Sequence, residues 1–229
     1  NFDLLLYEVP PITLEKIIRK IKKHYQIKTF LMLKDIFPQN AVDIGLMKKN
    51  SFIFKYFKRK EKLLYEVSDY IGCMSKENVN YILKHNPKIS KEKVGYFPNT
   101  KKDNGNKDID FELKKEKLQF VYGGNMGLPQ GVLNIAPAIS SFKNEKDIEF
   151  IFIGRGTERD KISEYFKEQK NVKVLENLPR EEYEKLLSNC DAGFIFLDSR
   201  FTIPNYPSRT LAYLEKGIPI IAATDKNTD

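Results

Sequence analysis

The chain has 229 residues, 41% of them hydrophobic and 12% aromatic, and a formal net charge of +8 at pH 7. This size and composition predict one large or two small domains with real apolar cores, and they exclude a low-complexity chain. The apolar runs are too short to span a bilayer. The positive charge favours an anionic partner, whether nucleotide, nucleic acid or acidic membrane, without choosing among them.

The cysteines and histidines give no sign of a metal or a disulfide framework. Cys73 and Cys190 lie far apart, which favours a reduced, cytoplasmic-type pair, and no CxxC motif or histidine cluster is present. His24 and His85 each end a predicted helix, where positive charge suits the helix dipole. We therefore expect no metal, and we expect both histidines to be structural or solvated.

Short apolar runs alternate with amphipathic segments along the whole chain. The predicted strands cover residues 3–7, 28–33, 70–73, 94–97, 118–122, 149–153, 172–175, 192–196 and 219–222. The predicted helices cover residues 13–24, 52–67, 75–85, 131–142, 157–168, 180–188 and 208–216, with Thr13, Ser75 and Thr157 as candidate N-caps. Continuous apolar strands of this length are typical of parallel sheets covered on both faces. The alternation predicts an α/β protein with doubly wound parallel sheets.

One polar, charged and turn-rich stretch, NTKKDNGNKDIDFELKKEK at residues 99–117, breaks this rhythm. We interpret it as an interdomain linker. Residues 1–98 would then supply part of one Rossmann-like domain, and residues 118–229 most of a second, with the two domains facing each other across a cleft.

Two glycine-containing loops, FVYGGNMGLPQG and IFIGRGTERD, each follow a predicted strand of the second domain. Glycines let the backbone approach a phosphate closely and point N–H groups at it. The pattern is not GxGxxG and lacks the usual acidic ribose contact, which argues against a nicotinamide enzyme. Plain tight turns remain an alternative. The candidate phosphate-binding residues are Gly123, Gly124, Asn125, Met126, Gly127, Gln130, Gly154, Arg155 and Gly156.

A third loop opens the stretch PNYPSRTLAYLEKGIPIIAATD at residues 204–225. Its polar turn, Pro207, Ser208 and Arg209, precedes a short apolar helix that stops at Gly217. A helix N-terminus presents free N–H groups, and an arginine adds a fork-shaped cation suited to phosphate. All three loops lie at carboxyl ends of strands, where open α/β sheets bind ligands. The alternative is an ordinary strand–helix connection.

In the first domain, LMLKDIFPQN places Lys34 and Asp35 at the carboxyl end of a strand. Asp35 could orient or deprotonate an acceptor hydroxyl, and Lys34 could meet a phosphate. The alternative is a solvated charge pair.

Residues 46–63, LMKKNSFIFKYFKRKEKL, carry seven basic residues against one acid, with aromatics between them. A basic amphipathic helix of this kind suits an anionic membrane surface, and it could also track nucleic acid. The alternative is a domain helix with its aromatics in the core and its lysines in water.

Taken together, several runs resemble the retaining GT-B glycosyltransferases of family 4, in the branch that builds bacterial capsular and O-antigen polysaccharides. They are YIGCMSKENVNYILKHNP, KEKVGYFPNT, YGGNMGLPQGV, FIGRG, LPREEYEKLLSNCDAGFIFL and PNYPSRTLAYLEKGIPIIAATD. The resemblance covers essentially all 229 residues in order.

The resemblance implies two Rossmann-like domains, the second holding a nucleotide-sugar donor, expected to be a uridine diphosphate (UDP) sugar. It implies a glycan or lipid-linked acceptor on the first, hexosyl transfer with retention, and neither metal, cofactor nor nucleic acid. It also implies a cytoplasmic location, with contact to the inner membrane face through residues 46–63, and further chain beyond both ends of this sequence.

The chain departs from the family pattern at several charged positions. Neutral Asn125 and Gln130 stand where the family has an arginine and a lysine on the donor diphosphate. Pro204 and Ala212 stand where it has paired glutamates, and Lys34 where it has a histidine. The resemblance therefore assigns the diphosphate to arginines and backbone N–H groups, and both glutamates are missing. The residues expected to serve are Arg155, Arg209, Tyr206 and Glu215, the last lying three residues after Ala212 on the same helical face.

Two other functions remain open from the sequence. A GT-B-fold sugar-nucleotide epimerase would use a similar cleft, but it needs carboxylate and histidine acid–base groups, and histidines are sparse here. The other is a non-catalytic basic module that binds nucleotide, nucleic acid or membrane through a degenerate cleft.

Overall fold

The computed structural model describes residues 2–100 and 116–229, so most of the expected linker lies outside the described residues. The chain divides into two compact units. The first comprises Asn1–Asn99 with Arg200–Tyr206 and Asp225–Asp229, and the second comprises Thr100–Ser199 with Pro207–Thr224. Two short segments from late in the sequence thus join the first unit, whereas the sequence placed them in the second domain.

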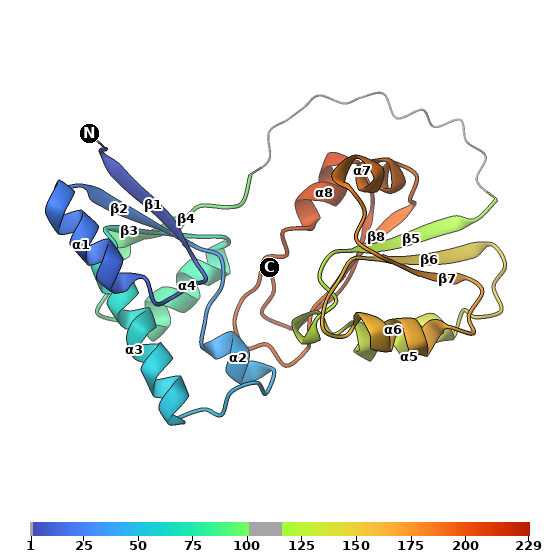
Figure 1. The fold of residues 1–229 in the computed structure, drawn as a ribbon, viewed down its shortest axis with the longest axis horizontal. Coiled ribbons are helices and arrows are strands. Elements are labelled where there is room, and N and C mark those ends of the chain that lie inside the picture. The colour runs from blue at the N-terminus through green and yellow to red at the C-terminus, as the bar shows by residue number, and fades with distance from the viewer. Residues whose placement is uncertain (1, 101–115) are drawn as a thin grey trace. The chain divides into compact units, whose positions relative to one another are not determined.

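The first unit contains a parallel sheet in the order β1-β2-β3-β4, which follows the chain. Its register pairs Leu4 with Lys28 and Phe30 with Tyr70. Its strands are β1 (Leu4–Val9), β2 (Lys28–Leu33), β3 (Tyr70–Cys73) and β4 (Val94–Tyr96). Its helices are α1 (Glu15–Tyr25), α2 (Gln39–Asp43), α3 (Phe52–Val67) and α4 (Lys76–His85), with a 3₁₀ turn at Lys91–Lys93 (Figure 1).

The N-terminus of α4 shows why a helix begins where it does. The Ser75 hydroxyl accepts a hydrogen bond from the Asn78 N–H at 3.0 Å, which confirms the predicted cap. The caps predicted at Thr13 and Thr157 are wrong. The helices there begin two residues later, after positions that already have helical backbone angles and make no side-chain cap bond. A preceding turn of chain, rather than a side chain, starts both helices.

The second unit contains a five-stranded parallel sheet in the order β7-β6-β5-β8-β9. The chain moves outward from β5 through β6 to β7, then crosses back to β8 and β9, so the order reverses beside β5. Its strands are β5 (Leu118–Gly123), β6 (Ile148–Ile153), β7 (Val172–Leu175), β8 (Ala192–Phe196) and β9 (Ile220–Ala223). Its helices are α5 (Val132–Ser140), α6 (Arg159–Phe166), α7 (Arg180–Ser188) and α8 (Thr210–Glu215), with a 3₁₀ turn at Leu128–Gln130. The predicted doubly wound parallel arrangement is confirmed.

Helices cover both faces of this second sheet (Figure 1). Side chains of α5 and α6 pack with aromatic residues of the strands, among them Phe152 and Phe194, into one apolar cluster. Side chains of α7 and α8 pack against the other face, with Val121 and Ile195, into a second cluster. Because neighbouring strand residues point to opposite faces, each strand must be apolar on both sides. This explains the unbroken apolar runs in the sequence.

Tyr213 attaches α8 to the sheet. Its side chain is fully buried, and its hydroxyl lies 3.1 Å from the Phe194 carbonyl oxygen and 3.3 Å from that of Val121. Gly193 in β8 leaves room for this ring, because an added Cβ at Gly193 would lie only 2.7 Å from it. The position of α8, and of the residues just before it, therefore depends on this ring.

We expect Tyr213→Ala to lower the free energy of unfolding by about 3–5 kcal/mol, because it leaves a cavity under α8. Tyr213→Phe keeps the ring and should cost only about 1 kcal/mol, the net value of a hydrogen bond. Urea unfolding followed by circular dichroism measures both changes. Equal losses in the two variants would contradict the packing role of the ring.

Candidate functional site

A pocket of about 650 Å³ lies in the second unit at the carboxyl ends of β5 and β6, next to the reversal of strand order. Open α/β sheets bind ligands at such a switch point because two neighbouring loops diverge there. We call it the switch-point pocket. It is lined by Gly123, Gly124, Asn125, Gln130, Ile153, Asn177, Leu178, Arg180, Tyr183, Ser208, Arg209 and Ala212.

Arg209 is the cation in this pocket whose surroundings most favour an anion. Its guanidinium carbon lies 4.2 Å from the centroid of the Tyr122 ring, a cation–π distance. One of its terminal nitrogens, Nη1, is buried and has no hydrogen-bond partner among the described residues. A buried, unpaired donor is costly, and an anionic ligand would satisfy it.

Tyr122 is the platform that holds Arg209. It is fully buried, stacks on Phe196 with ring centroids 5.5 Å apart, and donates its hydroxyl hydrogen to the Asn125 carbonyl oxygen at 2.6 Å. Burial raises the pKa of Tyr122, and the Arg209 charge holds that rise back. Sequence reasoning missed this residue, although its place directly before the first glycine pair was a usable signal.

The two glycine loops pack against each other. The Gly124 N–H donates to the Ile153 carbonyl oxygen at 2.8 Å, and the Met126 N–H donates to the Arg155 carbonyl oxygen at 2.8 Å. A Cβ on Gly154, whose φ is +142°, would lie 2.0 Å from the Gly124 carbonyl oxygen. A side chain on Gly156 would meet the Met126 backbone in the same way. Loop-to-loop packing therefore accounts for these glycines, while the phosphate role remains a prediction.

The neutral pair Asn125 and Gln130 lies in the pocket, and its two side chains are bonded to each other. The Asn125 amide donates to Gln130 Oε1 at 3.1 Å, and the Gly127 N–H lies 3.3 Å from the same oxygen. Met126, also predicted at the donor, has its side chain completely buried in the core. Its backbone is engaged too, because the N–H donates to the Arg155 carbonyl oxygen and the carbonyl accepts from the Glu158 N–H, and Met126 does not line the pocket.

Four predicted site residues, unlike Arg209, do not line the switch-point pocket. Arg155 is exposed and does not line the switch-point pocket. Glu215 lines an adjacent pocket of about 330 Å³ that shares Arg180, Tyr183 and Ala212 with the first. Tyr206 belongs to the first unit, and Pro207 opens the second. The helix predicted from Ser208 begins at Thr210 and has six residues. Before it, the Thr210 N–H bonds to the Pro207 carbonyl oxygen and the Leu211 N–H to that of Ser208, as in a turn, although Arg209 already has helical backbone angles.

The sequence missed one wall of the pocket, formed by Asn177, Leu178, Arg180 and Tyr183. Tyr183 accounts for the lack of a side chain at Gly123, because a Cβ at Gly123 would lie 2.0 Å from the Tyr183 hydroxyl oxygen. Burial raises the pKa of Tyr183 to about 12, so its hydroxyl stays neutral. The available signal was the run LPREEYEKLL after the strand β7. It carried part of the family resemblance without being assigned a role.

In the first unit, Lys34 Nζ pairs with Glu8 Oε2 at 2.6 Å at the ends of β2 and β1. Asp35, exposed as a whole residue, lines a pocket of about 300 Å³ whose walls include Phe37 and Phe57. Burial of its carboxyl raises the pKa of Asp35 above the ordinary 3.8, and Lys34 limits the rise. Lys34 and Asp35 therefore do not act as a pair: Lys34 binds Glu8, and Asp35 lies against apolar side chains.

Within the described ranges, no group of three or more histidine, cysteine or acidic side chains could hold a metal ion. Cys73 and Cys190 are buried, and neither forms a disulfide among the described residues. Every helix within residues 2–100 and 116–229 is too short or too polar to span a bilayer. The expectation of metal-free chemistry remains a prediction.

Known proteins that resemble this chain include glycosyltransferases. No protein-family profile matches the chain. A protein of Pseudomonas aeruginosa named "Probable glycosyltransferase WbjE" is 28% identical over 240 residues, covering 99% of this chain and 58% of its own length. This chain therefore spans little more than half the length of that relative.

Solved structures show the same architecture. Anabaena HepE in complex with UDP superposes with a TM-score of 0.70 at 12% identity, over 99% of this chain and 61% of HepE. The lipopolysaccharide outer core galactosyltransferase WaaB gives a TM-score of 0.64 at 13% identity, over 96% of this chain and 56% of WaaB. The fold is GT-B. The predicted α/β class with two Rossmann-like units is confirmed.

We expect Asp35→Asn to stabilise the chain at pH 7, because burial disfavours the charged carboxylate that the amide replaces. The raised pKa means that ionisation opposes folding above the folded-state pKa. Below the ordinary value of 3.8 the carboxyl is protonated in both states, so the gain disappears. Urea unfolding from pH 7 towards pH 4 should show the gain shrinking. Asp160→Asn, at a side chain 94% exposed, is the control. A gain independent of pH would contradict the assignment.

Proposed function

We propose that this chain is part of a retaining GT-B glycosyltransferase of the family 4 type. It would move a sugar from a nucleotide-diphosphate donor to a glycan or lipid-linked acceptor during assembly of a bacterial surface polysaccharide. The observation that carries the proposal is the buried guanidinium nitrogen of Arg209 in the switch-point pocket, which has no partner in the part of the chain that the structure describes. The named relative and the GT-B architecture support the reaction class.

The proposed chemistry is positioning together with stabilisation of charge. As the bond to the sugar breaks, negative charge grows on the leaving diphosphate, and a cation already fixed in place lowers the barrier without reorganising. Arg209 is fixed by the Tyr122 ring beneath it. Arg180 offers a second cation at the same pocket, and the Ser208 hydroxyl offers a further donor. Arg155 would have to approach the diphosphate when ligand binds.

The donor is proposed to be a UDP-sugar held without a metal. HepE has been solved with UDP-glucose and with UDP, and its fold superposes on nearly all of this chain. Neutral Asn125 and Gln130 can contribute hydrogen bonds but no charge, so the arginines carry the electrostatic role. Glu215, beside Arg180 in the adjacent pocket, is proposed to serve the ribose or sugar. On the acceptor side, Asp35 is proposed to orient the attacking hydroxyl.

Arg209→Ala should weaken UDP binding by at least about tenfold, because a charged hydrogen bond contributes roughly 1.5–3 kcal/mol. Arg209→Lys should recover only part of this, since lysine lacks the planar fork. Isothermal titration calorimetry measures both variants, with Arg19→Ala on α1 as a control that removes one exposed arginine elsewhere. Unchanged affinity in Arg209→Ala would overturn the proposal. Sugar turnover without any acceptor would indicate the epimerase instead.

The same proposal includes contact with an anionic membrane through residues 46–63. Phe52 is 92% exposed and Ile53 61%, at the start of α3, and Leu46 is 68% exposed just before it. Exposed lysines, Lys48 and Lys55 among them, surround these apolar side chains. Apolar residues ringed by cations match the interface of an acidic bilayer. Part of the helix nevertheless serves the core, since Leu64 and Tyr65 are buried.

We expect Phe52→Ser with Ile53→Ser to reduce binding to vesicles containing an anionic phospholipid by more than about tenfold. Fully burying each such side chain contributes roughly 1.5–3 kcal/mol. Vesicle flotation measures the bound fraction, with vesicles of a zwitterionic phospholipid for comparison. Ile17→Ser, at a 57% exposed position on α1, is the matched apolar control. Equal binding by the double variant and the control would exclude this surface.

A further inference from the structure

The two glycines that follow Tyr122 each leave room for one polar side chain. An added Cβ at Gly123 would lie 2.0 Å from the Tyr183 hydroxyl oxygen, and one at Gly124 would lie 3.3 Å from Arg209 Nη2. Both polar side chains line the switch-point pocket, Tyr183 from α7 and Arg209 from the turn before α8. The glycine pair therefore gives a hydroxyl and a guanidinium access to the same pocket.

The backbone of the first glycine loop has little left to offer a ligand. The Gly124 N–H donates to the Ile153 carbonyl oxygen at 2.8 Å, and the Gly127 N–H lies 3.3 Å from Gln130 Oε1. Both donors are thus already bonded within the protein. Part of the hydrogen bonding to a ligand must then come from side chains.

Tyr183 has an unused hydroxyl on an anchored ring. The ring packs against the apolar cluster that contains Leu187 and Tyr213. The hydroxyl makes no hydrogen bond with any residue in the described ranges. Burial raises the pKa of Tyr183 to about 12, so the hydroxyl keeps its hydrogen at neutral pH, and the nearby Arg209 charge limits the rise. A half-buried tyrosine hydroxyl usually has a hydrogen-bond partner, and here a ligand would supply it.

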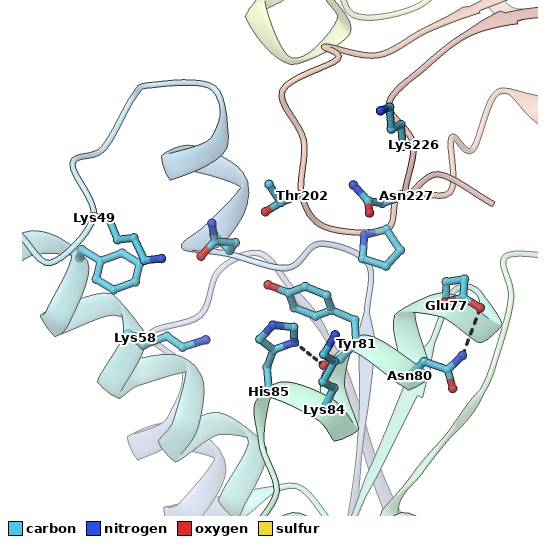
Figure 2. A pocket seen from close by; sticks show the side chains of 13 residues that line it. Lys49, Lys58, Glu77, Asn80, Tyr81, Lys84, His85, Thr202, Lys226 and Asn227 are labelled. Atoms are coloured by element: carbon cyan, nitrogen blue, oxygen red, sulfur yellow. Dashed lines mark hydrogen bonds between the residues drawn. The ribbon is translucent and has the colours of Figure 1, made fainter.

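The large pocket of the first unit, of about 840 Å³, is different (Figure 2). Four lysines line it: Lys49, Lys58, Lys84 and Lys226. Glu77 lies among them, and Lys58 pairs with Glu61. Asp43 accepts a hydrogen bond from Thr202, which also lines the pocket. Acids therefore offset much of the lysine charge, so this pocket is a weaker candidate for an anion than the switch-point pocket.

We propose that Tyr183 is a donor-binding residue whose hydroxyl donates a hydrogen bond to the diphosphate that Arg209 holds. The inference rests on the proposed glycosyltransferase function and adds a contact within the same pocket. A hydroxyl is neutral, so it adds a hydrogen bond beside Arg209 and Arg180 without adding repulsion between like charges. Negative charge grows on the diphosphate as the sugar leaves, so this hydrogen bond strengthens towards the transition state.

The test is isothermal titration calorimetry of Tyr183→Phe with UDP and with inorganic pyrophosphate. The change removes the hydroxyl and keeps the ring in its apolar cluster. We expect both ligands to bind about tenfold more weakly, as for the loss of one hydrogen bond to a charged group. Unchanged affinity for both ligands would overturn the proposal. A loss for UDP alone would also overturn it, because the hydroxyl would then contact the nucleoside.

Tyr165→Phe is the matched control. Tyr165 lies on α6, is 48% exposed and does not line the switch-point pocket. This variant should bind both ligands as the wild type does, and a loss equal to that of Tyr183→Phe would contradict the assignment. Thermal unfolding of Tyr183→Phe should match the wild type, since its hydroxyl bonds no described residue. A clearly lower melting temperature would make the hydroxyl structural and overturn the proposal.

The two ligands also separate this inference from the proposed function. If the wild type and Tyr183→Phe bind UDP equally well, the proposed function stands and the role of Tyr183 fails. If the wild type binds pyrophosphate in a way that depends on Tyr183 but does not bind UDP, the glycosyltransferase proposal fails and the contact to the anion stands.

Discussion

The parallel direction of the strands is the constraint from which the candidate site follows. Parallel neighbours need crossover helices, and every strand of a sheet then releases its following loop at the same edge. In the second unit, β5 and β6 release the two glycine loops, which pack so closely that Gly154 tolerates no side chain. The reversal of strand order beside β5 leaves the switch-point pocket open.

Arg209 shows how stability and function are balanced there. The buried Tyr122 ring holds its guanidinium by a cation–π contact, while one buried nitrogen has no partner among the described residues. An unsatisfied donor opposes folding, and selection for stability alone would remove it. The diphosphate of the proposed donor would satisfy this nitrogen, and the free energy lost in the unliganded protein would then be recovered on binding.

In the first unit, the acid Asp35 and a group of four lysines line two different pockets. Asp35 is held against apolar walls that raise its pKa, while four lysines gather around a different pocket. The exposed Phe52 and Ile53 lie on the helix that contributes Phe54 and Lys58 to that pocket.

Local periodicity and local hydrogen-bonding patterns were enough to predict the strands, the parallel α/β class and the Ser75 cap. The sequence also indicated Arg209. It could not show that Tyr122 supports Arg209, that Tyr183 occupies the space above Gly123, or that Arg155 lies outside the pocket lining. Nor could it bring Lys226 and Lys84 to the walls of one pocket. Those relations join residues distant in the chain, and only tertiary packing decides them, because it sets which side chains share one desolvated space.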